Sequence, residues 1–289
     1  MNVLDRFVAA FSPQAGLRRL AARRALAYYE AAEPSRTRRV RRSDMPINDL
    51  VERSTVSLRA QARLLERNHD LARGALRVLV NNTVGPGGIG IEPQPRRSDG
   101  SIHEEYAQAL RELYAEWQRR PEVTGRFTWA KAQRLLARAW LRDGESFAKD
   151  VIGPVSGLQH GSRLPYSVEL FEADLCPVEF SDSGRGIRQG VELSAWGRPR
   201  AYWCHKQDQR TSLLLPTIAD LVRVPAERVA HVAMIDRIGQ IRGVSEFASV
   251  ISRLDDIKDY EESERIAAKI AAMLTAYVKK GGPEAFVPD

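Results

Sequence analysis

Apolar residues recur at helical spacing through residues 47–80. The positions that carry this spacing are Leu50, Val51, Leu58, Ala62, Leu65, Leu71, Ala75, Leu76 and Leu79. Side chains three or four residues apart share one face of a helix, so the segment predicts one or two amphipathic helices. The Asn-, Gly- and Pro-rich residues 81–88 then end the helical pattern, and residues 89–93 are typical of a short strand.

Two more helices are predicted further along the chain, over residues 103–119 and 127–142. Ser101 and Thr128 are the candidate N-terminal caps of these helices. From Gly144 onward the apolar period falls towards two, which favours strands.

The strand-like segments are residues 146–152, 167–171, 188–193 and 199–205. Residues 192–202 resemble a hairpin in which Gly197 supplies the positive φ of the turn. Residues 221–234 hold a short polar connection, PAERV, beside a strand-like run. Turn-rich connectors between these segments favour an antiparallel arrangement.

A long helical pattern begins at Val244 and continues to Lys280, where Gly281, Gly282 and Pro283 end it. Apolar residues interpreted as one face of this helix are Phe247, Val250, Leu254, Ile257, Ile266, Ile270, Met273 and Tyr277. About 35 residues at 1.5 Å each give a helix of about 50 Å, long for a compact domain. We therefore predict an α+β fold with a helical N-terminal part, an antiparallel β-rich region and a long protruding C-terminal helix.

The formal net charge of +7 resides in an N-terminal arm. Between Leu17 and Arg42 there are nine arginines and two glutamates, so the rest of the chain sums to zero. The arginines that end this arm are Arg36, Arg38, Arg39, Arg41 and Arg42. Such an arm suits a polyanion such as nucleic acid, because each neutralised phosphate releases counterions. A solubilising or subunit-bridging tail is the alternative.

Motif chemistry is sparse. The sequence has no GxxxxGK[ST] phosphate-binding loop, no GxSxG and no HExxH, so it predicts no cofactor, no metal and no ATP hydrolysis. Two cysteines are too few for a disulfide framework. No apolar run is long enough to span a membrane, and we expect a soluble protein with no membrane partner.

Several carboxylates near the predicted strands could form a nuclease-like metal site or an acid–base pair if the fold brings them together. These residues are Asp143, Glu145, Asp150, Glu172 and Asp174. Acidic residues are also common at turns and strand ends. A metal-dependent nuclease therefore stays an alternative, as does a monomeric DNA-binding protein that uses the arginine arm.

Four segments in fixed order resemble the lambda-type family of tailed-phage portal proteins. They are LRAQARLLERNHDLARGALRVLVNNTVGPGGIG, RDGESF with LPYSVELFEADL, GVELSAWGRPRAYW, and VPAERVAHV followed by RIGQIRGVSEFASVISRLDDIKDYEESERIAAKIAA. Together they cover most of residues 58–272. The family commonly has Pro at the position of Ile238, and its members are usually much longer. We therefore expect the C-terminal part, with a return stem helix, to be absent from this sequence.

The resemblance implies a non-enzymatic ring of about a dozen identical subunits, closed by cyclic symmetry, at one vertex of the capsid. It implies residues 1–45 as a basic arm, 46–240 as the wing domain, and 241–289 as the stem helix with a truncated end. The implied partners are other copies of the chain, double-stranded DNA in the channel, the large terminase subunit, and head–tail adaptor, scaffold and capsid proteins. The implied locations are the portal vertex of the virion and, during assembly, the host cytoplasm.

On this interpretation the stem residues nearest DNA or neighbouring stems are Asp255, Lys258, Asp259, Glu262, Arg265 and Lys269. Carboxylates repel DNA phosphates, so a bore lined by them would let a duplex slide without sticking. Gly239 and Gly243 would form the joint between wing and stem.

Overall fold

The computed structural model describes residues 45–205 and 220–273. The chain divides into two compact units, Met1–Pro46 and Ile47–Asp289. The arginines of the predicted arm lie outside the described residues, as do Tyr277 and the predicted end of the long helix.

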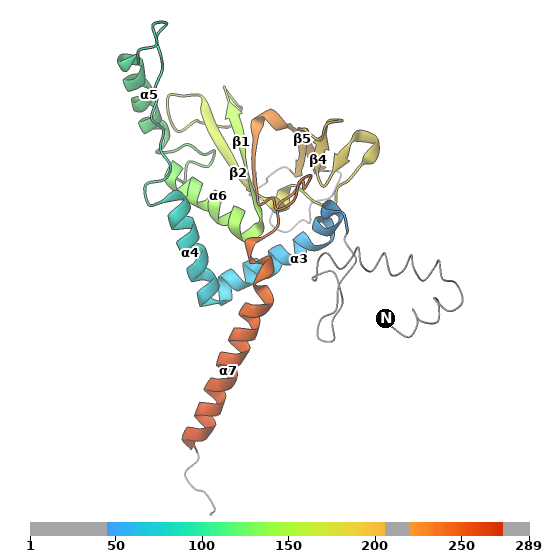
Figure 1. Cartoon of the computed structure of the whole chain (residues 1–289). Helices are drawn as coiled ribbons and strands as arrows, with labels where there is room; N and C mark the ends of the chain where they lie inside the picture. Colours follow the sequence, from blue (N-terminus) through green and yellow to red (C-terminus); the bar gives the residue numbers. More distant parts are fainter. Residues whose placement is uncertain (1–44, 206–219, 274–289) are drawn as a thin grey trace, which may run out of the picture. The chain divides into compact units, whose positions relative to one another are not determined.

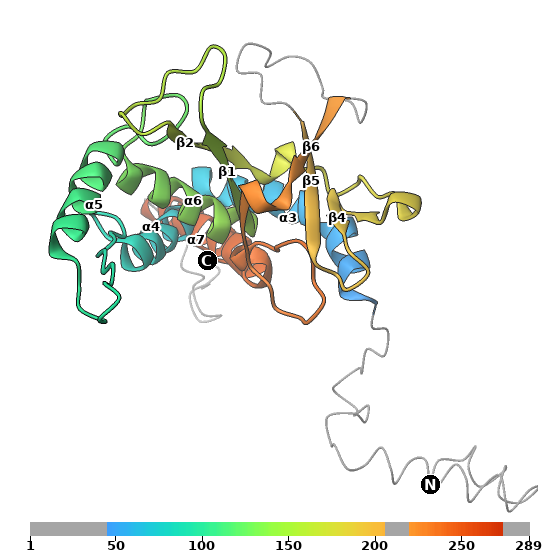
Figure 2. The ribbon, with the colours of Figure 1, turned by 90° about the horizontal axis from the view of Figure 1, so that it is seen from above.

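A helical layer forms first along the chain. Helices α3 (Ile47–Asn68) and α4 (Asp70–Val84) confirm the prediction for residues 47–80, and α6 (Trp129–Asp143) packs against both. Their apolar stripes meet in one buried cluster, which also takes in Phe247 and Ile251 from the C-terminal region. Figure 1 shows α3 below the strands and α4 and α6 beside them, and Figures 1 and 2 both show α5 (Glu104–Trp117) at the far end.

Two local predictions here are corrected. Residues 89–93 belong to no strand: the hydrogen bonds of Ile89 go to the Gln133 side chain and to Tyr114 rather than to a neighbouring strand. The cap of α5 is His103, whose Nδ1 accepts from the Tyr106 amide, and not Ser101. The predicted cap Thr128 is confirmed at α6, where its side chain accepts from Lys131 N.

The strands form two antiparallel sheets. One has the order β2-β1-β7, with β1 (Glu145–Ile152) between β2 (Tyr166–Glu172) and β7 (Val229–Ala233). The other has the order β3-β4-β5-β6, formed by β3 (Ile187–Arg188), β4 (Val191–Leu193), β5 (Pro199–His205) and β6 (Leu221–Pro225). The antiparallel region and the hairpin at Gly197, φ 75°, are confirmed.

The segment predicted as one strand over residues 188–193 is two strands. Gln189 adopts a positive φ of 54° and Gly190 one of 78°, so the backbone turns between β3 and β4. Behind the sheets a second apolar cluster forms around Phe147, which stacks on Phe171 and on the His231 ring. The α6–β1 corner at Gly144 joins this cluster to the helical layer.

The last described element, helix α7 (Ile251–Met273), begins seven residues later than predicted. The chain first runs through a loop and a 3-10 turn at Glu246–Ser249. Ile251 is buried in the helical cluster, whereas every residue from Asp255 to Met273 is exposed, as the projecting helix in Figure 1 illustrates. The α+β class with a long protruding helix is thus confirmed.

The prediction that the apolar residues of this helix share one face is wrong. Ile257 and Ile266 are nine residues apart, which at 100° per residue places them on opposite sides. Large apolar side chains therefore stand exposed around α7; they are Ile257, Tyr260, Ile266, Ile270 and Met273.

Candidate functional site

The six charged residues predicted near DNA or neighbouring stems occupy one side of α7. Residues three or four positions apart lie on the same side of a helix, and this spacing links all six. They are Asp255, Lys258, Asp259, Glu262, Arg265 and Lys269. The buried Ile251 precedes Asp255 by four residues, so this charged face continues the face by which α7 packs on the body. None of the six makes an ion pair with another described residue, which leaves their charges available.

Part of this charged face lies opposite the corner between α3 and α4. Lys258, Glu262 and Arg265 line a hollow of about 310 Å³ together with His69 at that corner. His69 is buried, and its Nε2 lies 3.0 Å from the carbonyl oxygen of Leu254 in the first turn of α7. Since a buried hydrogen bond to a helix end restricts its direction, His69 fixes how α7 leaves the body.

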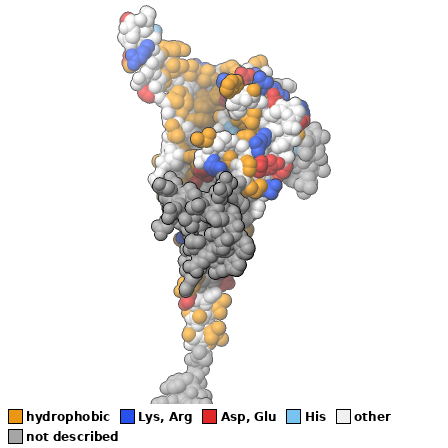
Figure 3. Space-filling model, turned by 45° about the vertical axis from the view of Figure 1, so that its right-hand side comes forward, with side chains coloured by type: hydrophobic (Ala, Val, Ile, Leu, Met, Phe, Trp, Pro, Cys, Tyr) orange, Lys and Arg blue, Asp and Glu red, His pale blue; other side chains and the backbone are white. Residues whose placement is uncertain are grey.

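Hydrophobic side chains predominate on the α7 surface that faces the viewer in Figure 3. Ile266 is 51% exposed and Ile270 57% exposed, with no described residue covering them. Exposed apolar side chains grouped on one element are typical of a contact surface. The helix thus combines a charged face with exposed apolar side chains.

The segment between β7 and α7 holds the two predicted joint glycines. Gly239 has a φ of +84° with open space around it, as a turn residue requires. Gly243 differs, because a Cβ built there would lie 1.9 Å from the Gly144 carbonyl oxygen. Its amide donates to Glu145 and its carbonyl oxygen accepts from Thr55 at 3.3 Å. The geometry at Gly243 is that of a clamped contact between backbones.

Arg242 anchors the same segment from inside the protein. Its side chain is fully buried, and Nε and Nη2 donate to the equally buried Glu145 at 2.6–3.0 Å. The guanidinium also donates to the carbonyl oxygens of Gln189 and Cys176, at 2.6 and 2.8 Å. One side chain thus ties the approach to α7 to both sheets.

Burial by itself raises the pKa of Glu145, but the Arg242 charge and the His231 hydrogen bond outweigh it. The net effect holds the pKa of Glu145 well below its ordinary value of 4.5. Arg59 adds a second cation at 3.2 Å from Glu145. The carboxylate is therefore an ionised, saturated acceptor rather than a proton donor.

The fold does bring four of the five candidate carboxylates together at the α6–β1 corner. Arginines occupy all four: Arg63 lies 2.8 Å from Asp143, 3.2 Å from Glu172 and 2.5 Å from Asp174, and Arg242 holds Glu145. The fifth, Asp150, accepts from the Tyr166 hydroxyl at 2.8 Å instead. Within the described ranges no group of His, Cys, Asp and Glu is placed to hold a metal ion. The arrangement is a structural ion network.

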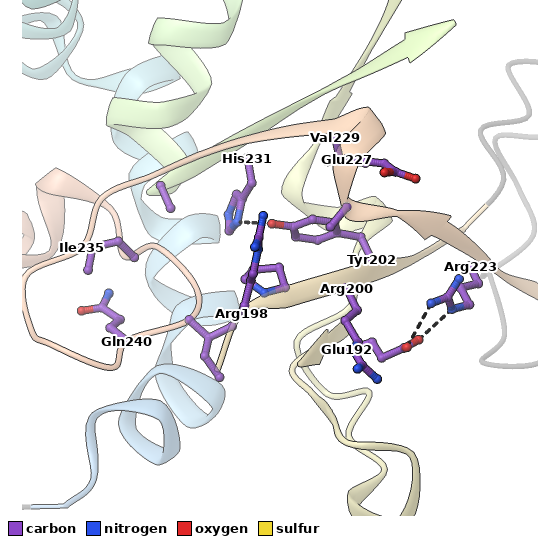
Figure 4. A pocket seen from close by; sticks show the side chains of 14 residues that line it. Glu192, Arg198, Arg200, Tyr202, Arg223, Glu227, Val229, His231, Ile235 and Gln240 are labelled. Atoms are coloured by element: carbon purple, nitrogen blue, oxygen red, sulfur yellow. Dashed lines mark hydrogen bonds and ion pairs between the residues drawn. The ribbon is translucent and has the colours of Figure 1, made fainter. Parts of the chain in front are cut away.

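A groove of about 890 Å³ opens between the two sheets, beside this network. Figure 4 shows His231 and Tyr202 pointing toward each other, with Arg198 and Arg200 among the other side chains that line the groove. His231 Nε2 lies 3.0 Å from Glu145 and Nδ1 lies 3.4 Å from the Tyr202 hydroxyl, so both ring nitrogens are engaged. Burial raises the pKa of Tyr202 to about 12, which keeps the phenol neutral. His231 is thus a partnered strand residue.

Sequence reasoning missed the arginines that organise this corner. Arg59 stands inside the apolar stripe of α3, between Thr55 and Ala62, which are both buried. A charged residue within such a stripe signals a buried ion pair, because an unpaired charge there is costly. Nothing in the local pattern identified its distant partner, Glu145.

Three further findings bear on identity. No helix among the described residues is long and apolar enough to cross a membrane. The family model for phage portal proteins of the lambda family matches residues 33–289. The probable portal protein of Halomonas phage phiHAP-1 is 25% identical over 229 residues, which are 78% of this chain and 43% of that relative. The chain spans less than half the length of that curated relative. Since the family match covers most of the chain, the chain belongs to the lambda family of phage portal proteins.

Proposed function

We propose that this protein is a non-enzymatic portal subunit. It assembles with about eleven other copies into a ring of cyclic symmetry at the portal vertex of a virion, through which DNA enters and leaves the head. Family membership supports the portal role. The ring size, the passage of DNA and the docking of a terminase are the finer parts of the proposal.

The observation that carries the proposal is the surface of α7. Nineteen consecutive residues, Asp255–Met273, leave the body with a charged face and uncovered apolar side chains. Copies packed side by side would bury the apolar residues, and each buried isoleucine would contribute roughly 1.5–3 kcal/mol. Ile266 lies on the same side of α7 as Glu262 and Lys269, so part of the charged face would lie at the contacts between stems and the rest would face the channel. Carboxylates there repel phosphates, which keeps the duplex from binding the wall.

The anchoring of α7 fits a stem that keeps a fixed direction relative to the body. His69 directs its first turn, and Arg242 and Gly243 clamp the segment before it. In this proposal the segment with Gly239 and Gly243 holds the stem in a fixed direction relative to the wing and does not act as a free hinge. The described body of the second unit before α7 is the wing, and DNA movement is driven by a separate ATPase that docks on the ring.

The remaining partners are proposed from the same role. Head–tail adaptor, scaffold and capsid proteins contact the ring during assembly in the host cytoplasm. The arginine arm would contact one of these proteins. A metal-dependent nuclease is not favoured, because the carboxylates that could serve it are saturated by arginines.

The proposal is tested by measuring self-association of the chain. Sedimentation and single-particle mass measurement would give the number of copies per particle over a series of protein concentrations. Replacing Ile266 and Ile270 together with Asp should abolish association through α7, whereas Val56→Asp, an exposed position on α3, should not. A chain that stays monomeric at every concentration, with no difference between the variants, refutes the proposal.

The DNA-binding alternative has its own readout. If the protein were a monomeric DNA-binding module, neutralising Arg36, Arg38, Arg39, Arg41 and Arg42 would lower the salt slope of its DNA affinity by about four to five. The portal proposal expects little affinity for free DNA and therefore little slope to lose.

A further inference from the structure

An exposed tryptophan stands at the tip of the β4–β5 hairpin. Trp196 is 95% exposed, although the turn around it is well ordered by hydrogen bonds. Ser194 N donates to Arg198 O at 2.8 Å, Gly197 N donates to Ser194 O at 2.9 Å, and the Ser194 hydroxyl accepts from Trp196 N and Arg198 N. The indole is therefore presented on a fixed support with no partner in the described part of the chain.

A second exposed apolar residue accompanies it. Ile238, in the loop before α7, is fully exposed, and its loop lines the same inter-sheet groove as the hairpin residues Arg198 and Pro199. Arg198 and Arg200 are exposed in the hairpin, and Arg198 makes no ion pair with a described residue. We call Trp196, Ile238, Arg198 and Arg200 the knob surface. It combines two exposed apolar side chains with two exposed arginines.

A matching apolar groove lies beside α5. It measures about 340 Å³, and its walls are almost entirely carbon. Its lining includes Ile91, Leu110, Leu113, Trp117 and Tyr166. Ile91 is 57% exposed, and the extended residues 89–93 leave this side of the groove without a neighbouring strand. We call this groove, together with α5, the groove surface.

Charge distinguishes the two surfaces. Helix α5 carries four glutamates against one arginine, namely Glu104, Glu105, Glu112 and Glu116 against Arg111. The segment 187–205, which holds the hairpin, carries three arginines, Arg188, Arg198 and Arg200, against Glu192. Glu116 and Arg188 are neutralised by Arg163 and Asp49 within the chain. Among the described residues, Glu104, Glu105 and Glu112 on one surface and Arg198 and Arg200 on the other make no ion pair, so the two surfaces carry opposite charges that can attract each other.

The positions of the two surfaces on the body determine whether one copy or two copies can form the contact. Figures 1 and 2 both show α5 at one end of the body and β4 at the other, so one copy cannot join its own two surfaces. Two different patches at opposite ends of a subunit make a head-to-tail interface, which closes into a ring when the rotation permits.

We propose that the knob surface of one copy docks on the groove surface of the next copy around the ring. The Trp196 indole fills the apolar groove, and Arg198 and Arg200 lie near the acidic α5 helix. This proposal rests on the proposed portal function, since it names one contact by which wings of neighbouring subunits meet.

Disulfide crosslinking between two tagged variants tests the contact. Trp196→Cys in one chain and Leu110→Cys in another should give a mixed dimer on oxidation by diamide, because each thiol loses a hydrogen and the reagent gains both. The matched pair Trp196→Cys with Val78→Cys, exposed on α4 outside the groove, should give little. The native Cys176 and Cys204 are buried. Crosslinking of both pairs alike, or of neither while the copies associate, overturns this interface and leaves the ring proposal standing.

A second measurement uses affinity. Trp196→Ala should weaken self-association about 30-fold, the effect of a central aromatic anchor worth about 2 kcal/mol. Val56→Ala is the matched control and should change it less than about threefold. An unchanged affinity in Trp196→Ala contradicts the interface, whereas a chain with no self-association at all contradicts the portal proposal itself.

Discussion

Replacing Arg242 with Met tests the claim that one buried ion pair holds the approach to α7. The substitution keeps an unbranched side chain of similar reach and removes the guanidinium. It leaves Glu145, which is completely buried, without its bidentate partner, and it leaves the carbonyl oxygens of Gln189 and Cys176 without their donors. Arg59 at 3.2 Å and His231 at 3.0 Å compensate only in part.

The expected loss of folding stability follows from these lost contacts. Removing one partner of a buried pair costs about 3–5 kcal/mol, mainly because the remaining charge stays buried. With a urea dependence of about 2 kcal/mol per molar, the unfolding midpoint should fall by about 1.5–2.5 M. Far-ultraviolet circular dichroism and tryptophan fluorescence of the whole chain would follow the transition.

The control is Arg223→Met, because Arg223 also grips a carboxylate with two nitrogens, at 2.7 and 3.0 Å from Glu192. That pair is exposed, so its loss should cost less than about 1 kcal/mol. Adding Glu145→Gln to Arg242→Met should recover part of the stability by removing the unpaired charge. Equal, small losses in the two single variants would refute the reasoning.

Three further outcomes are expected. The pKa of Glu145 is depressed in the folded chain, so its contribution to stability is complete above pH 4.5 and is lost as the pH falls below that value. The stability of the Glu145→Gln variant should therefore depend less on pH in the acid range than that of the native chain. Gly243→Ala should destabilise the chain, because the added Cβ would overlap the Gly144 carbonyl oxygen. The control Gly74→Ala has open space in α4 and should stabilise the chain by about 0.5–1 kcal/mol. Equal urea midpoints for the two variants would contradict the close backbone contact at Gly243. His69→Ala should speed amide hydrogen exchange in the first turns of α7 and leave α5 unchanged, and protection equal to that of the native chain would rule out its anchoring role.

The sequence by itself determined the element types. Spacing of three and four residues marked α3, α4, α5 and α6, and alternation marked the strands, because these periods follow from backbone geometry within a few turns. The four ordered segments also led to the family, which the match over residues 33–289 confirms. Local chemistry sufficed for the hairpin, where only a turn glycine suits the φ at position 197.

Only the tertiary structure decided which residues are partners. Glu145 and Arg242 are 97 positions apart, and His69 meets Leu254 across 185 positions, so no local period could pair them. Four of the five candidate carboxylates of the sequence are paired with arginines, among them arginines of α3 and α6. A buried charge is costly without an opposite charge beside it, and the partners come from distant parts of the chain. The direction of α7 and the exposure of Trp196 likewise depend on packing between distant segments, which a one-dimensional pattern does not contain.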